Sequence, residues 1–283
     1  MDKEDIELKY VPEMEDALLI ACFEGWGNAL EVSMGMADYL IRKLEAEPFG
    51  RINPDPFYLF KERRPVIEVE DGTLKHFDPP GCDLYAVSRD KAGRDMIILK
   101  GEEPDLQWFR FTDRILSFCR EVGVKTVISC GGMLDNILHT ETMISVVASN
   151  RELIDDLQGR KASIINYKGP SSIHSTLHFE AKKRDFDCIG LYCHCPYYLQ
   201  GVTHFGLLSY LGRFLSEWAG FELDTEELSA SWKEVGKQVQ EAIKKNPELK
   251  DIVNDIKMSR TRGKLDAGKK GDKVIKLEDY LRI

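Results

Sequence analysis

The chain has 283 residues, 43% of them hydrophobic, and a formal net charge of −9 at pH 7. This apolar content is ample for a buried core, while the acidic balance argues against nucleic acid or an anionic membrane as a partner. No stretch approaches the ~20 consecutive apolar residues of a membrane span and no secretory leader is recognisable, so we expect a cytoplasmic protein.

The first predicted unit covers residues 17–45 and consists of a strand, a loop and a helix. Residues 17–23 are a short apolar run, which is typical of a strand buried on both faces. A loop with two glycines follows, since glycine permits positive φ and close backbone approach. Asn28, with Glu31 three residues later, matches a capping box at the start of the helix.

The next part of the chain favours short strands and a hairpin. Residues 66–70 and 73–77 alternate around Asp71-Gly72, which is a strong signal for a β-hairpin. Further strands are predicted over 84–88 and 95–99. Residues 1–16 are interpreted as a charged lead-in. Residues 47–50 indicate the stop of the preceding helix, and residues 57–60 indicate a short strand.

Helices and buried strands then alternate to residue 219. We expect helices over 106–123, 151–157, 173–184 and 205–219. We expect strands over 126–130, 144–148, 164–167 and 188–193, the first of them ending at Gly131-Gly132. This alternation predicts an α/β fold of three layers, αβα, around a mainly parallel sheet with the hairpin inserted.

The carboxyl-terminal part of the chain differs in composition. The predicted organisation is an α/β domain over 1–222 and a helical appendage over 223–258. A flexible basic linker over 259–273 and an apolar tail over 274–283 follow. An apolar tip on a flexible tether is typical of a docking peptide. The candidate partner contacts are therefore Tyr280, Leu281 and Ile283, unless the tail folds back on its own subunit.

Glycine-bearing loops follow four of the predicted strands, and in a parallel sheet such loops meet at one edge. They supply the ligand-binding candidates Gly25, Trp26, Gly27, Asn28, Gly101, Pro104, Gly131, Gly132, Thr140, Gly169, Pro170 and Ser171. Loop N–H groups at a helix start can bind an anion. A general acid or base would come from Glu24, Glu103 or His139, which are weak candidates because spacing does not show that they converge.

Signatures of known catalytic and metal sites are incomplete. Gly25-x-Gly27 begins a dinucleotide loop, but Leu30 stands at the third glycine position. A zinc site could combine His174 and His178 with residues 193–195, although two histidines on one helix face are the simpler interpretation. The seven cysteines mostly lie in apolar runs, which indicates reduced thiols. We therefore expect no cofactor and no metal, and the sequence favours a protein without catalytic activity.

Several short stretches, in their order and spacing, resemble the PAC-type family of proteasome assembly chaperones. They are Gly25-Trp26, Glu47-Pro48-Phe49, Phe57-Tyr58, Arg64-Pro65, Gly101–Pro104 with Trp108, His139-Thr140, Tyr167 with Gly169-Pro170, and Pro196 with Tyr198. The resemblance implies a fold similar to nucleoside phosphorylases and self-association, with a trimer as one candidate state. Eukaryotic relatives serve as chaperones of proteasome assembly.

The chain departs from the family pattern in the loops that would define a shared pocket. The departures are Asn136–Leu138 and Glu141-Thr142 around His139, Ser172 in place of a usual glycine, and Tyr197 in place of a usual histidine. The tail also ends Tyr280-Leu-Arg-Ile283, whereas proteasome-binding tails often end in a hydrophobic residue, tyrosine and any residue.

Two functions stay open at this point. The preferred one is a self-associating, non-enzymatic scaffold that acts as an adaptor or assembly factor for a proteasome-like or other protein complex. The alternative is a protein that binds a nucleoside- or phosphate-like small molecule at the loop cluster, or a hydrolase- or phosphorylase-like enzyme that uses it.

Overall fold

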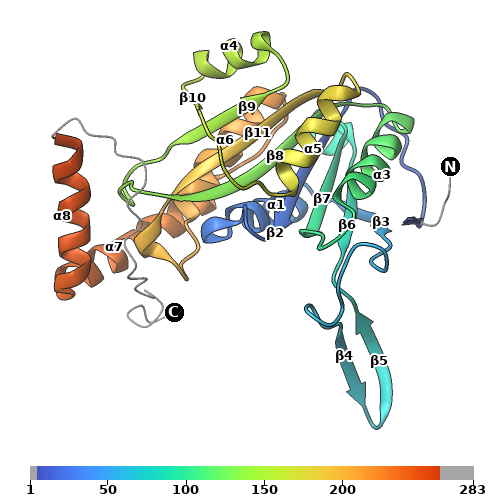
Figure 1. The fold of residues 1–283 in the computed structure, drawn as a ribbon, viewed down its shortest axis with the longest axis horizontal. Helices are drawn as coiled ribbons and strands as arrows, with labels where there is room; N and C mark the ends of the chain where they lie inside the picture. The colour runs from blue at the N-terminus through green and yellow to red at the C-terminus, as the bar shows by residue number, and fades with distance from the viewer. Residues whose placement is uncertain (1–4, 262–283) are drawn as a thin grey trace.

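A nine-stranded mixed sheet forms the centre of the computed structural model, which describes residues 5–261 (Figure 1). In spatial order the strands are β1 (Ile6–Leu8), β3 (Glu47–Ile52), β6 (Cys82–Val87), β7 (Met96–Glu102), β2 (Ala17–Glu24), β8 (Val124–Asp135), β11 (Asp187–Pro196), β9 (Ile144–Ala148) and β10 (Ser163–Ile164). Neighbours from β7 to β11 run parallel, whereas the flanking β6 and β9 run antiparallel to them. The predicted α/β class is confirmed, with its parallel strands at the centre of the sheet.

Helices cover both faces of the sheet, and β2 contributes to a buried core on each face. The body contains η1 (Ala29–Glu31), α1 (Val32–Lys43), α2 (Arg89–Ala92), α3 (Trp108–Glu121), α4 (Arg151–Gly159), α5 (Ile173–Lys183), η2 (Tyr197–Leu199) and α6 (Phe205–Ala219). Leu18, Ile20 and Cys22 pack into one core with α1 and α6. The intervening residues of β2 pack into the other core with α3 and α5. A continuous apolar run is what such a position requires, because successive strand residues face opposite sides.

The predicted hairpin is a separate two-stranded sheet outside the body. Its strands are β4 (Val66–Glu70) and β5 (Thr73–Asp78), which pair antiparallel. Figure 1 shows them projecting away from the central sheet. Asp71 and Gly72 have φ values of 49° and 73°, as a tight hairpin turn of the I′ kind requires at both central residues. We call residues 66–78 the ribbon.

Two helices follow the body, α7 (Glu226–Lys245) and α8 (Pro247–Thr261). Their apolar residues, among them Val239 and Ile256, join the same buried core as α1 and α6. The predicted appendage is therefore helical, while the boundary at residue 222 stays a prediction. The tail residues Tyr280, Leu281 and Ile283 lie outside the described residues. Within residues 5–261, every helix falls short of the length and apolarity that crossing a bilayer requires.

Three local predictions were wrong. The lead-in contains the edge strand β1, and the helix stop at 47–50 is the first part of strand β3. Residues 57–60 are not a strand but a turn and loop, in which Phe57 and Tyr58 are both buried. A run of consecutive apolar residues is typical of a buried strand, but here a loop packs the rings of both residues inward.

The loops predicted at Gly101 and at Gly131-Gly132 are also absent, because β7 and β8 run on through these glycines. A Cβ on Gly101 would overlap the carbonyl oxygen of Gly81 and the backbone of Cys82. A Cβ on Gly132 would lie 2.5 Å from the carbonyl oxygen of Ala29. These glycines allow a neighbouring segment to approach closely rather than turning the chain.

Candidate interaction site at the strand ends

The loop after β2 is held by the side chain of Asn28. Its Oδ1 accepts from the backbone N–H groups of Ser33 (2.8 Å) and Met34 (3.1 Å), and its Nδ2 donates to Glu24 Oε2 (2.6 Å). Asn28 thus binds N–H groups at the start of α1, but the predicted capping box is wrong, because the three-residue turn η1 separates Asn28 from that helix. Glu31, the expected partner in that box, instead accepts from Thr203 Oγ1.

A buried carboxylate joins three segments at the ends of the central strands. Glu103 Oε2 accepts from the backbone N–H of Trp26 (3.1 Å), and Oε1 accepts from that of Ile173 (2.7 Å) at the start of α5. The backbone N–H of Glu103 donates to the carbonyl of Glu24 (2.7 Å). A helix N-terminus favours an anion, and here the protein's own carboxylate takes that position. The anion site predicted at this edge is thus filled internally.

His174 fills the space beside this carboxylate. Its ring meets Phe23 edge-on at 5.3 Å between centroids, and neither ring nitrogen has a hydrogen-bond partner among the described residues. Burial lowers the pKa of His174 to about 4, so the ring is neutral at pH 7. A Cβ on Gly27 would lie 2.8 Å from this ring. We call Trp26, Gly27, Glu103, Ile173 and His174 the Glu103 cluster.

The structure brings most of the predicted loop residues to this cluster. Gly132 N–H donates to the carbonyl of Gly27 (2.7 Å), and a Cβ on Gly25 would lie 2.5 Å from Glu103 Oε2. The loop of Gly169, Pro170 and Ser171 leads directly into Ile173. The cluster is closely packed, so its groups face one another rather than an open cavity.

His139 makes its contacts with other elements. Its backbone N–H and its Nδ1 both lie within hydrogen-bond distance of the Tyr198 hydroxyl, at 2.7 and 2.8 Å, and Thr140 beside it is exposed. Burial, and after it the charge of Lys257 on α8, lowers the pKa of His139. His139 therefore packs against Tyr198 of η2, and its ring meets the Tyr198 ring edge-on.

Exposed apolar side chains lie on segments that adjoin the cluster in the sequence. Trp26 is 63% exposed although its backbone N–H is bound to Glu103. Leu106 and Phe109 follow Glu103 at the start of α3, and Tyr167 donates its hydroxyl to the carbonyl of Pro170 (2.8 Å). We call Trp26, Leu106, Phe109 and Tyr167 the apolar rim. Exposed aromatic and aliphatic side chains on rigidly held loops are typical of a protein-binding surface.

A hydrogen-bonded series of three side chains lies on neighbouring strands. His194 Nδ1 is 2.7 Å from Asp135 Oδ2, and His194 Nε2 is 2.7 Å from Ser145 Oγ. A serine, a base and an orienting acid in this order can activate a nucleophile. Ser145 is only 3% exposed, however, and lies within β9 between two paired strands. The series, which we call the relay, ties β8, β11 and β9 together. Sequence analysis missed it because its residues share no local motif.

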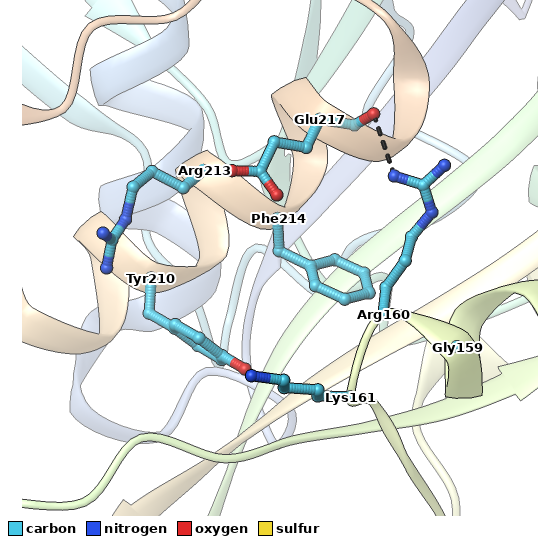
Figure 2. A pocket seen from close by; sticks show the side chains of 7 residues that line it. All are labelled: Gly159, Arg160, Lys161, Tyr210, Arg213, Phe214 and Glu217. Atoms are coloured by element: carbon cyan, nitrogen blue, oxygen red, sulfur yellow. Dashed lines mark hydrogen bonds between the residues drawn. The ribbon is translucent and has the colours of Figure 1, made fainter.

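A surface pocket of about 340 Å³ lies apart from all these residues, between the end of α4 and α6 (Figure 2). Its lining includes the basic residues Arg160, Lys161 and Arg213 around the rings of Tyr210 and Phe214. Arg160 donates to the backbone carbonyl of Glu217 (3.2 Å), as the dashed line in Figure 2 shows. The pocket contains none of the predicted site residues. Among the described residues, no three His, Cys, Asp or Glu side chains gather in a way that could hold a metal ion.

Comparison with known families and structures gives a consistent result. A family model described as PAC2 matches residues 22–243. A PAC2 family protein from Streptomyces avermitilis is 24% identical, with a TM-score of 0.75, over 84% of this chain and 100% of that chain. A proteasome-assembly chaperone homologue from Mycobacterium tuberculosis is 22% identical, with a TM-score of 0.74, over 83% and 99%.

An archaeal protein extends the comparison. PbaB from Pyrococcus furiosus, described as a proteasome activator, is 19% identical, with a TM-score of 0.64, over 84% of this chain and 98% of that chain. Identities below 25% establish a shared fold rather than a shared activity. No curated protein matches the sequence.

Proposed function

The chain belongs to the PAC2 family, and on that premise we propose that it is a self-associating adaptor or assembly factor for protein complexes, proteasome-like ones among them. The names of its structural relatives support a chaperone-like role, since two of them are described by their relation to proteasome assembly or activation. We further propose that the protein works in the cytoplasm. The phosphorylase-like character of the fold also stays a proposal.

The observation that carries this proposal is the apolar rim around a filled interior. In open α/β sheets, small ligands bind beyond the carboxyl ends of the strands. In this chain Glu103 and His174 fill that region, while Trp26 and Phe109, each more than 60% exposed, face solvent around it. A surface of this kind favours binding of another protein over binding of a small ligand.

The test is affinity capture from native lysate with identification by mass spectrometry. The baits are the full chain, a chain ending at Gly263, a rim variant carrying Trp26→Ser and Phe109→Ser, and the control Met258→Ser. Met258 is also half exposed, but it lies on α8. We expect the full chain and the control to recover the same discrete complex and the rim variant to lose it.

The shortened chain tests the proposed contacts of Tyr280, Leu281 and Ile283. Loss of the complex with this bait alone would assign the docking to the tail rather than to the rim. Equal recovery of the complex by all four baits would show that neither the rim nor the tail is the contact, and recovery of the bait alone would contradict the adaptor proposal. A recovered partner is accepted only if the purified partner binds the purified full chain.

The relay favours one alternative function, a hydrolase, because its serine and histidine stand at hydrogen-bond distance. A fluorophosphonate probe tests this, since it forms a covalent bond only with an activated and accessible serine. Labelling that disappears in Ser145→Ala would support the hydrolase. Thermal-shift measurements with nucleosides, nucleotides and phosphate test small-molecule binding, because a bound ligand must raise the melting temperature.

A further inference from the structure

Four apolar side chains lie together on one face of the ribbon. Ile67 pairs with Phe77, and Val69 pairs with Leu74, so these four side chains lie on the same face. A register shift between these pairs inserts Lys75, which brings Leu74 to the face of Phe77. Each of the four is more than half exposed. The opposite face carries Val66 and the polar residues Glu68, Glu70, Thr73, His76 and Asp78.

The chain's own body does not cover this face. Among the described residues that form the two buried cores, none comes from the ribbon. A lone two-stranded hairpin is marginally stable in water and gains stability when its apolar face packs against another layer. An exposed ribbon with four apolar side chains on one face therefore indicates a missing partner layer.

Ion pairs at the base fix the direction in which the ribbon projects. Arg51 Nη2 donates to Asp78 Oδ1 (3.1 Å) on one leg, where β5 ends. On the other leg, Arg63 Nη1 donates to Glu102 Oε2 (2.8 Å) at the end of β7. Both legs are thus held to the body, from which the ribbon projects (Figure 1).

The two ends of the ribbon carry opposite charges. Glu70 and Asp71 are exposed at the tip. Lys61, Glu62 and Arg64 are exposed just before the base, where they carry a net positive charge. Two ribbons that run antiparallel would set the tip of each beside the base of the other. Such an arrangement has a two-fold axis and uses the same surface on both copies.

We propose that the ribbon packs its apolar face on the ribbon of a second copy of this chain, antiparallel, to form a two-fold dimer. The inference rests on the self-association in the proposed function and names its surface. Ile67, Val69, Leu74 and Phe77 of both copies make the buried layer between the two ribbons. The polar faces stay in solvent, and the carboxylates at each tip meet the basic base of the other copy.

Light scattering on the purified full chain tests the proposal. Because four side chains per copy make a small contact, the samples should span about 1 to 500 µM, where small interfaces associate. We expect the mass to rise from monomer to dimer. Ile67→Ser with Phe77→Ser should raise the dissociation constant about tenfold or more, since two apolar anchors per copy leave the contact.

The matched control is Val66→Ser. Val66 is more exposed than Ile67 or Phe77, yet it lies on the opposite face of the same strand. This variant should therefore dimerise as the unchanged chain does. A loss of dimer that is equal in the control would indicate a general effect on the ribbon rather than packing of its apolar face, and it would overturn the proposal.

Charge reversal tests the antiparallel arrangement. Glu70→Lys and Arg64→Glu should each weaken the dimer by about threefold, because each sets like charges at both ends of the contact. An equal mixture of the two variants should form a heterodimer as tight as the original dimer. In that heterodimer the introduced lysine meets the introduced glutamate, and the original Arg64 and Glu70 meet each other.

Four results would overturn the inference. They are a chain that stays monomeric over the whole range, a dimer insensitive to Ile67→Ser with Phe77→Ser, a ribbon-dependent trimer, and a mixture no tighter than its parts. If the chain is monomeric but the ribbon variant loses a captured partner, the ribbon binds a foreign protein. The purified chain alone reports on dimerisation and lysate capture reports on the adaptor function, so either can fail without the other.

Discussion

The Glu103 cluster and the ribbon both lie where the chain leaves the central sheet, but they differ in which groups they bury and which they expose. In the cluster, polar groups turn inward, and one carboxylate binds the N–H groups of Trp26 and Ile173. In the ribbon, apolar groups such as Ile67 and Phe77 turn outward and leave the two cores untouched. The cluster therefore joins three segments of the fold to one another, and the ribbon exposes a surface that a partner could cover.

A pair of glycines gives the largest expected difference between the two regions. Gly101→Ala, in the strand that leads to Glu103, would force a Cβ into the backbone of Gly81 and Cys82 and should cost about 3 kcal/mol or more of unfolding free energy. Gly72→Ala at the ribbon tip has open space and should cost about 1 kcal/mol for its left-handed φ. Urea unfolding measures both. Similar losses would contradict the description of a packed cluster and a free ribbon.

The pH dependence of stability should come from histidines buried in the body rather than from the ribbon. His174 and the buried His204 titrate near pH 4 in the folded chain but near 6.5 when exposed. The unfolded chain therefore binds more protons between these values, so stability is full above pH 6.5 and falls as the pH drops towards 4. Each histidine contributes on the order of 3 kcal/mol. Urea unfolding at pH 7 and pH 4.5 should show a smaller difference in His174→Phe than in the unchanged chain.

Removal of the bridging carboxylate should have an intermediate effect. Glu103→Ala leaves two buried N–H groups without their acceptor and removes the anion at the start of α5, which should cost about 2 to 3 kcal/mol. Glu103→Gln keeps one acceptor oxygen and should lose less. The control is Glu68→Ala on the polar face of the ribbon, where we expect a change within about 0.5 kcal/mol. A Glu103→Ala protein as stable as the control would show that the carboxylate does not hold the cluster.

The smallest effect should follow from the ribbon's apolar face. Phe77→Ser, measured in dilute protein where copies are separate, should change the free energy of unfolding by less than about 0.5 kcal/mol, since the ring is exposed. Most large-to-small changes of a phenylalanine in a core cost far more. A large loss in dilute protein would mean that the ribbon packs on its own body.

Local sequence patterns predicted the elements whose causes are local. The apolar run of β2 needs both faces buried, and the turn at Asp71-Gly72 needs two positive φ values. The helix predicted from residue 151 begins there, where Asn150 caps α4 by accepting from the N–H of Leu153 (2.9 Å). The bounds predicted for α6 agree with the structure at both ends. Each of these depends on residues within a few positions of one another.

Elements that depend on distant partners were missed. The edge strand β1 and its neighbour β3 pair with each other across more than forty residues, and neither has a strong pattern of its own. Gly101 and Gly132 indicated loops, although their real role is to admit the backbones of Gly81 and Ala29. A glycine in sequence shows that something needs space, and the structure alone shows what occupies it.

The same limit applies to the candidate site. Glu103 stood out as a loop carboxylate, but its two partners lie 77 and 70 residues away, so its bridging role had no local signal. The relay combines residues 10 to 59 positions apart, on three strands. Sequence reasoning placed the candidate residues at one edge of the sheet, but it could not show that Glu103 and His174 are buried there.

Trp26 joins two environments in a single residue. Its amide is anchored to Glu103, while its indole is the most exposed of the four in the chain, since the other three are half-buried. Its emission should therefore report solvent, and its amide proton should exchange slowly. A partner that covers the apolar rim would shift the emission of this one residue without any dye, so the protein contains its own fluorescent reporter of binding.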